Sequence, residues 1–264
     1  MTYFHGYSEE EQTRLDGQSS YFEKSLVLDG LHYSKGERIL DIGCGTGSNL
    51  SILQKAFPNC FFNGVDISKD QIQVARKRFP KFNFEIAPAQ KLPWEENTFD
   101  HIFIMWLLEH VSDPLKVLSE AFRVCRPGGT ITLTETDHTA FQLSPKSPQW
   151  VLLNESVVRF FNDNGQGDIG RQLANYLKKT KFEKPKNNVK AFHFSYGENR
   201  LELDRHANYV ADYLEISLEK LATHYDIKMS ELFTGLTHLR NLSRHSNGCL
   251  TQMMYRCSAI KPIS

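Results

Sequence analysis

Residues 41–47 read Asp-Ile-Gly-Cys-Gly-Thr-Gly and directly follow the strand-like run of residues 37–40. Three glycines within five positions let a tight strand-to-helix turn bring its backbone against a ligand, because no Cβ stands in the way. Such turns often hold phosphates. Here, however, Asp41 would repel a phosphate, and Ser48 stands where a dinucleotide-binding turn has its third glycine. The turn therefore favours a cationic ligand.

A second acidic residue follows the next apolar run, residues 60–65. Asp66 would lie at the tip of the second strand of a βαβ unit, where a carboxylate accepts hydrogen bonds from the ribose hydroxyls of an adenosine. NAD and S-adenosylmethionine (SAM) both contain this ribose, so Asp66 predicts nucleoside binding without choosing between them. Asp66 and Ser68 are also well placed to cap the helix that we expect from residue 69.

Three further segments complete a pattern. Residues 92–100 read Leu-Pro-Trp-Glu-Glu-Asn-Thr-Phe-Asp, residues 108–111 read Leu-Glu-His-Val, and residues 126–129 read Arg-Pro-Gly-Gly. In this order and spacing, together with the turn at 41–47, they resemble the small-molecule class I SAM-dependent methyltransferases related to the ubiquinone-pathway enzymes. The resemblance covers about residues 36–136. It implies SAM as the cofactor, which carries an ammonium and a sulfonium but no phosphate.

The pattern of apolar residues predicts an α/β fold in which strands and helices alternate. With the resemblance, it implies a Rossmann-like, mostly parallel seven-stranded sheet with helices on both faces and a helical cap. We expect one domain over residues 1–264, with an N-terminal lid helix within 1–30, a SAM-binding core at 36–140 and a cap insertion at 200–245. The expected strands are 37–42, 60–66, 82–87, 99–105, 129–136, 189–196 and 250–260, and the expected later helices are 149–162, 169–179, 201–222 and 229–239.

The resemblance also assigns the cofactor contacts. The turn should meet the methionine part of SAM, Asp66 the ribose, and Ile67 the adenine face. Related enzymes often carry an Asp in the segment that here reads Pro-Ala-Gln-Lys-Leu-Pro (residues 88–93), so the Ala89 N–H and the Gln90 side chain would substitute for it. Met105 and Trp106 should border the methionine and the methyl group. The expected turn residues are Asp41, Gly43, Cys44, Gly45 and Gly47.

The N-terminal helix is expected to close over SAM. Arg14 and Gln18 are four residues apart and share one helical face. In similar enzymes an arginine at this place binds the SAM carboxylate by a charge-assisted hydrogen bond. The alternative is an exposed helix with ordinary polar residues. Tyr7, ahead of this face, is a candidate lid residue or a core aromatic.

The candidate catalytic residues follow the fourth and fifth strands. His138 comes directly after a central strand and could accept a proton, tuned by Glu135 or by Asp137. The alternative is a hydrogen-bonded loop histidine. His110 is a second candidate base or a structural partner of the next helix. Some relatives hold a metal near Glu109-His110, but they carry another acid where this chain has Trp106, so we expect no metal.

The amino-acid composition limits the classes of molecule that the protein is expected to bind. The 31 basic and 31 acidic side chains cancel, which makes a nucleic-acid substrate unexpected. The five cysteines contain no C-x-x-C pair, residues 1–11 do not resemble a signal peptide, and no apolar run reaches the length of a membrane span. We therefore expect a soluble cytoplasmic protein with a small-molecule acceptor, no nucleic-acid or membrane partner, and a homodimer as one option.

The sequence thus predicts a SAM-dependent methyltransferase that modifies an oxygen or nitrogen atom of a small molecule. Three alternatives remain at this point. One is a dinucleotide-dependent oxidoreductase, which Asp41 and the absent third glycine disfavour. The others are a SAM-binding regulator without turnover and a methyltransferase that acts on a macromolecule.

Overall fold

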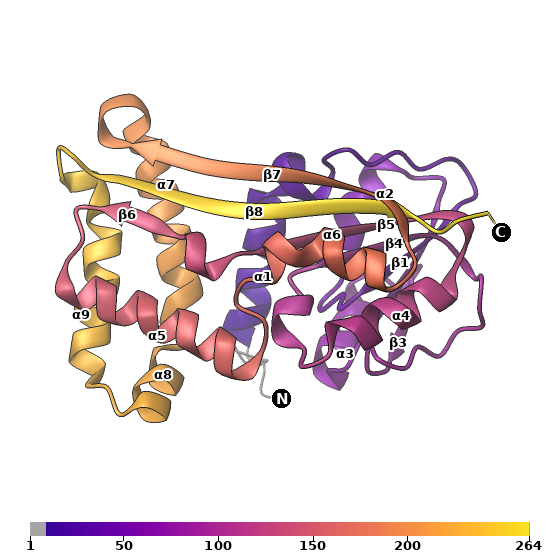
Figure 1. The fold of residues 1–264 in the computed structure, drawn as a ribbon, viewed down its shortest axis with the longest axis horizontal. Coiled ribbons are helices and arrows are strands. Elements are labelled where there is room, and N and C mark those ends of the chain that lie inside the picture. The colour runs from indigo at the N-terminus through magenta and orange to yellow at the C-terminus, as the bar shows by residue number, and fades with distance from the viewer. Residues whose placement is uncertain (1–8, 264) are drawn as a thin grey trace.

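The structure is a computed structural model that describes residues 9–263 (Figure 1). Tyr7 therefore lies outside the described residues. Within them the sheet has eight strands in the order β3-β2-β1-β4-β5-β8-β6, and β7 pairs with the other edge of β8. β1 to β5 are mutually parallel, whereas β6 and β7 run antiparallel to β8, as β8 does to β5. The strands are β1 (Arg38–Ile42), β2 (Phe61–Asp66), β3 (Asn83–Ile86), β4 (Phe99–Met105), β5 (Cys125–Thr136), β6 (Gln142–Ser144), β7 (Glu183–Ser195) and β8 (Cys249–Ile260).

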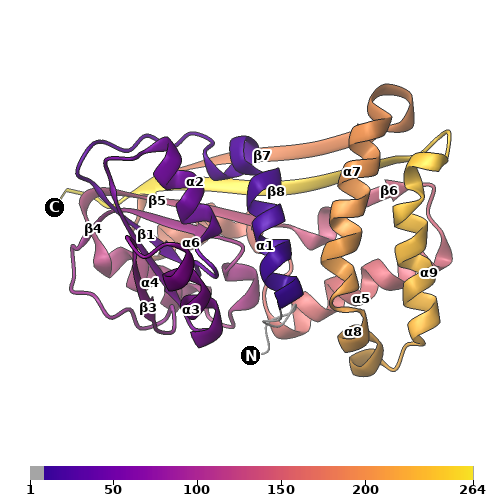
Figure 2. The ribbon, with the colours of Figure 1, turned by 180° about the vertical axis from the view of Figure 1, so that it is seen from behind.

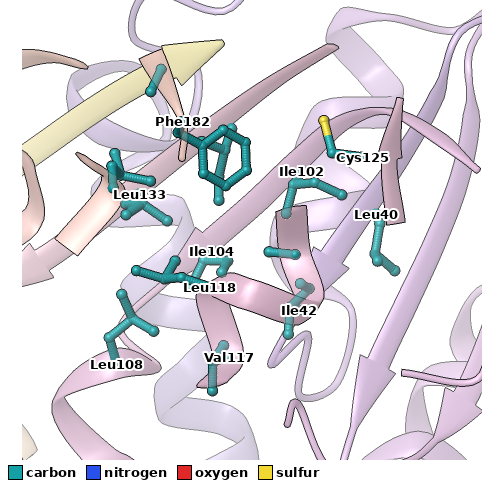
Figure 3. Close-up of a cluster of buried hydrophobic side chains, with 14 of the residues drawn as sticks. Leu40, Ile42, Ile102, Ile104, Leu108, Val117, Leu118, Cys125, Leu133 and Phe182 are labelled. Carbon is teal, nitrogen blue, oxygen red and sulfur yellow. The ribbon is translucent and has the colours of Figure 1, made fainter. Parts of the chain in front are cut away.

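Helices cover both faces of the parallel part, because its strands are apolar on both faces. Leu40 and Ile102 belong to the core under α4 and α6, which Figure 3 shows. Their neighbours Ile39 and Phe103 belong to the opposite core, under α1, η1, α2 and α3. This alternation is the two-residue period of a strand. The helices are α1 (Glu9–Tyr21), η1 (Glu23–Val27), α2 (Ser48–Ala56), α3 (Lys69–Arg78), η2 (Leu108–His110), α4 (Pro114–Val124), η3 (His138–Ala140), α5 (Pro148–Asn164), α6 (Ile169–Lys179), α7 (Tyr196–Glu215), α8 (Leu218–Tyr225), α9 (Met229–Arg240) and η4 (Leu242–Arg244).

A third core lies beyond the sheet. It joins α5, α7, α8 and α9 with β6 and the start of β8, and its fully buried members include Leu153 and Leu236. The paired strands β7 and β8 span both parts of the molecule, as Figure 1 shows. The cap therefore includes α5, which precedes the insertion expected at 200–245. Removing that insertion would expose apolar residues of α5, so the cap is no separable appendage.

Three details differ from the sequence expectations. The sheet has an eighth strand, β6, whose three residues pair with the start of β8. β7 begins at Glu183 rather than at residue 189, because its polar first half pairs with β8 along the edge of the sheet. The helix expected at 201–222 is two helices, α7 and α8, divided at residues 216–217. Leu214 and Leu218, on either side of this break, both enter the cap core.

No helix among the described residues is long and apolar enough to cross a membrane.

Candidate active site

A cavity of about 430 Å³ lies between the sheet and the cap. Its walls come from the carboxyl ends of β1, β2 and β4, from α1, and from α5 and α7. Figure 2 shows α1 standing between the sheet and α7. Parallel strands end at one edge of a sheet, and this is where ligands of such folds bind.

Most of the residues that the sequence singled out meet in this cavity. Its lining includes Arg14, Gly43, Cys44, Gly45, Asp66, Ile67, Ala89, Gln90, Met105, Trp106, His110 and His138. Three other candidates do not line it. Asp41 is buried beneath the turn, Gly47 is the N-cap residue directly before α2, and Glu135 is fully buried under the loop after β4.

The glycine turn is tied to the tip of β2. The backbone N–H groups of Gly43 and Cys44 donate to the Val65 carbonyl at 2.8 and 3.0 Å. The Gly45 N–H donates to Asp66 Oδ2 at 3.0 Å, and the Ser68 N–H donates to Oδ1 at 2.8 Å. Burial raises the pKa of Asp66, while these backbone hydrogen bonds oppose the shift. The turn and the carboxylate therefore form one rigid unit at the cavity wall.

Ile67 follows Asp66 and is 64% exposed although it is apolar. An exposed branched side chain on the rim of a cavity offers a flat ring a surface to pack against. Its position beside a carboxylate suited to a ribose agrees with the expected adenine contact.

Buried oxygen atoms without a hydrogen-bond donor show whether the cavity suits SAM. Among the described residues, Asn49 Oδ1 and Gln71 Oε1 are buried and accept no hydrogen bond. Asn49 on α2 and Gln71 on α3 also line the cavity. Buried acceptors usually have a donor, and SAM supplies donors through its ammonium, ribose hydroxyls and adenine amino group. The residues therefore fit this cofactor.

Sequence reasoning missed Asn49 and Gln71. The available signal was weak: Gln71 stands among the inward positions of α3, next to the buried Ile72. A polar side chain in a buried row of a helix needs a partner, and here the partner would be the ligand.

We expect Asp66→Ala to weaken SAM binding by roughly 1–3 kcal/mol, because the ribose loses a charged acceptor and the turn loses its anchor. Isothermal calorimetry measures this change. Ser68→Ala is the matched control: it removes the hydrogen bond from the Gln71 N–H to the Ser68 hydroxyl that caps α3, but leaves the carboxylate. Unchanged affinity in Asp66→Ala would mean that Asp66 serves the fold alone.

A second prediction concerns Asp41, whose pKa is raised from 3.8 to about 8 by burial and by the nearby charge of Asp66. An acid that holds its proton more tightly in the folded chain stabilises the fold at low pH, and this contribution is lost as pH rises through the folded pKa. The stability of ligand-free Asp41→Asn relative to wild type should therefore increase between about pH 4 and pH 8. Urea unfolding across this range measures it, and parallel pH profiles would contradict it.

His138 is paired with a carboxylate other than the expected one. Its Nε2 lies 3.0 Å from Glu109 Oε2, and its ring stacks on Phe161 with the centroids 3.8 Å apart. Asp137 is instead engaged by Arg171, whose Nε donates to Oδ2 at 2.8 Å. The loop after β4 folds back over the end of β5 and brings Glu109 to the histidine. The spacing of residues 135–138 in the sequence does not reveal this pairing of His138 with Glu109.

Glu135 holds that loop. It accepts hydrogen bonds from the backbone N–H groups of Leu107 and Leu108 at 3.0 and 2.8 Å. Burial and the neighbouring Glu109 raise its pKa well above the usual range. Burial is the largest single influence on Glu109 and raises its pKa, but His138, His110 and Arg14 together outweigh burial and lower the pKa of Glu109. The ionised partner of His138 is therefore Glu109, and Glu135 positions it.

His110 lies on the cavity wall with its Nε2 at 3.5 Å from Glu109 Oε1. Burial lowers the pKa of His110 to about 4, so its imidazole is neutral at physiological pH. Among residues 9–263, no group of three or more His, Cys, Asp or Glu side chains could hold a metal ion.

A seam of side chains joins the cofactor end of the cavity to the cap. The guanidinium of Arg14 on α1 lies 5.4 Å from the ring centroid of Tyr213 on α7, and Gln18 hydrogen-bonds Tyr209. One turn further, Tyr21 donates its hydroxyl to His206 Nδ1 at 2.9 Å. Each helix contributes one residue from each of three successive turns. These contacts hold α1 against α7, so α1 is not an exposed helix.

Comparison with known proteins agrees with this geometry. A family model described as "Methyltransferase domain" matches residues 33–174, more than half of the chain. An uncharacterised 37.1 kDa protein in a transposon of Streptomyces fradiae is 35% identical over 165 residues, which cover 60% of this chain and 46% of that protein. The ubiquinone/menaquinone biosynthesis C-methyltransferase UbiE of Desulfotalea psychrophila is 28% identical over 160 residues, 60% of this chain and 61% of that protein.

Among solved structures, phosphoethanolamine N-methyltransferase 2 of Haemonchus contortus in complex with SAM has a TM-score of 0.53. It is 19% identical, and the match covers 95% of this chain and 52% of that one, which shows the shared fold. The chain thus spans only about half to three fifths of the length of the two curated relatives. With a family model over more than half of its residues and a SAM-type cavity at the expected sheet edge, the chain belongs to the class I SAM-dependent methyltransferases.

Proposed function

We propose that the protein transfers the methyl group of SAM to an oxygen or nitrogen atom of a small molecule, with His138 as the proton acceptor. The observation that carries the proposal is that the His138–Glu109 pair lies on the wall of the same cavity that the glycine turn and Asp66 line. The cofactor supplies an already activated methyl group. The protein's task is then to align the acceptor, exclude water and remove a proton.

The pairing with Glu109 supports one nitrogen as the proton acceptor. Glu109 would accept a hydrogen bond from Nε2–H of His138, which would leave Nδ1 to take the proton. No hydrogen bond links Nδ1 to another described residue. The stacked Phe161 fixes the plane of the ring. A neutral imidazole with an anionic partner is suited to take a proton, because the imidazolium that forms is stabilised by Glu109.

The alternatives are less well supported. A SAM-binding regulator needs no polar pair beside the cofactor, yet His138 and Glu109 lie there, buried and hydrogen-bonded. A macromolecular acceptor needs an open site, whereas α5 and α7 wall this cavity on the cap side. Carbon is the second candidate atom, since one curated relative is named a C-methyltransferase.

Incubation with methyl-labelled SAM and a metabolite extract tests the proposal. We expect label in a small-molecule product, and the chemistry of that product identifies the methylated atom. Label in the protein or nucleic-acid fraction would indicate a macromolecular acceptor. Absence of any transfer, with SAM binding intact, would favour the regulator.

A further inference from the structure

The cap half of the cavity differs in character from the cofactor half. Its lining comes from α5, from α7 and from the segment between η3 and β6. These residues are mostly large and apolar, and nearly all are buried. The apolar ones are Phe141, Trp150, Val157, Val210 and Leu214.

None of the cavity-lining residues that η3, α5 and α7 contribute is an acid, a lysine or an arginine. The charged side chains on the described wall lie elsewhere and are engaged. Asp66 accepts from two backbone N–H groups, and Glu109 is paired with His138. Arg14 donates to Gln18 and lies over the ring of Tyr213.

This distribution restricts what the cap half can hold. Burying a charge without an opposite charge or hydrogen-bond partners costs several kcal/mol. A carboxylate, phosphate or ammonium pointing into the cap half would meet only apolar and neutral side chains. An apolar surface of the same size would instead be stabilised by leaving water.

Three polar side chains interrupt the apolar wall: Asn154 on α5, and Tyr209 and Tyr213 on α7. Tyr209 is engaged by Gln18 and Tyr213 by Arg14, both on α1. Asn154 lies on the same face of α5 as Trp150 and Val157, at helical spacing, and all three line the cavity. The side chain is half-buried and makes no hydrogen bond to another described residue. An amide can both donate and accept, so it can orient a hydroxyl or a carbonyl.

We infer that the body of the acceptor, the part remote from the methylated atom, is uncharged and apolar and carries one hydrogen-bonding group that Asn154 binds. This inference rests on the proposed function only in naming the ligand an acceptor. Asn154 is a specificity-determining residue, and the cap wall selects against charge.

Binding to protein saturated with S-adenosylhomocysteine tests the selection against charge. The probes share one ring system: 2-naphthol, 2,6-dihydroxynaphthalene and the anion 6-hydroxy-2-naphthoate. Calorimetry should show that each neutral probe binds about tenfold or more tightly than the anion. Equal or tighter binding of the anion would overturn the inference, and so would failure of both neutral probes to bind.

Two variants test whether the cap wall and Asn154 cause these binding preferences. Val157→Lys places a cation in the cap wall and should reverse the preference in favour of the naphthoate. Asn154→Leu should remove the advantage of 2,6-dihydroxynaphthalene over 2-naphthol and leave 2-naphthol binding nearly unchanged. An advantage that persists in Asn154→Leu contradicts the role of Asn154.

These measurements need no turnover. If the probes show the opposite binding preference, the labelling experiment still tests methyl transfer. If no labelled product forms, calorimetry still measures the charge preference of the cavity.

Discussion

His138→Gln should lower kcat by about 10²- to 10⁴-fold, the usual contribution of a positioned general base, while SAM affinity stays unchanged. Glutamine keeps a polar side chain of similar reach but cannot take up a proton. The side-chain contacts of His138 are with Glu109 and Phe161 rather than with the glycine turn, so the cofactor contacts should persist. Single-turnover kinetics with labelled SAM, together with calorimetry of SAM binding, separates the two quantities.

The pH profile distinguishes a base from a structural histidine. If His138 removes a proton, the variant should regain activity at alkaline pH, where the acceptor ionises in solution. Glu109→Gln should also lower kcat, because the amide no longer stabilises the imidazolium. Loss of folding in both variants, with no recovery of activity at high pH, would indicate that the pair serves the fold.

Gly45→Val should weaken SAM binding by about 100-fold or more while the protein stays folded. Gly45 has φ of +51°, a conformation that a β-branched residue adopts only under strain. Relief of this strain turns the Gly45 N–H away from Asp66. The new Cβ would lie 3.6 Å from Leu15 of the lid helix, which is ordinary contact. The fold therefore tolerates the valine side chain, but the altered turn should no longer fit the ligand. Calorimetry measures the affinity.

Gly30→Val is the matched control. Gly30 also has a positive φ, +67°, and a Cβ there meets no atom within 4 Å. The substitution carries similar backbone strain away from the cavity, so it should lower stability and leave SAM affinity unchanged. Equal loss of affinity in both variants would show that strain, rather than the position of Gly45 against the ligand, explains the effect.

The cofactor half of the site could be predicted from the sequence because its determinants are local. The turn at 41–47 requires glycines at positive φ, and Asp66 follows a strand that pairs directly with β1. Two adjacent parallel strands bring their carboxyl ends together whatever the rest of the chain does. The sequence therefore determined the fold class, and it predicted which residues bind the cofactor.

The His138–Glu109 pair and the cap were decided by the tertiary structure. Glu109 reaches His138 because Glu135 holds the intervening loop by backbone hydrogen bonds, and no spacing rule encodes that fold-back. Asn154 became part of the cavity wall only when α5 packed against α9, in the core that also contains α7. The partner of a side chain on a loop or an inserted helix depends on packing between segments distant in sequence, whereas a turn carries its requirements in its own residues.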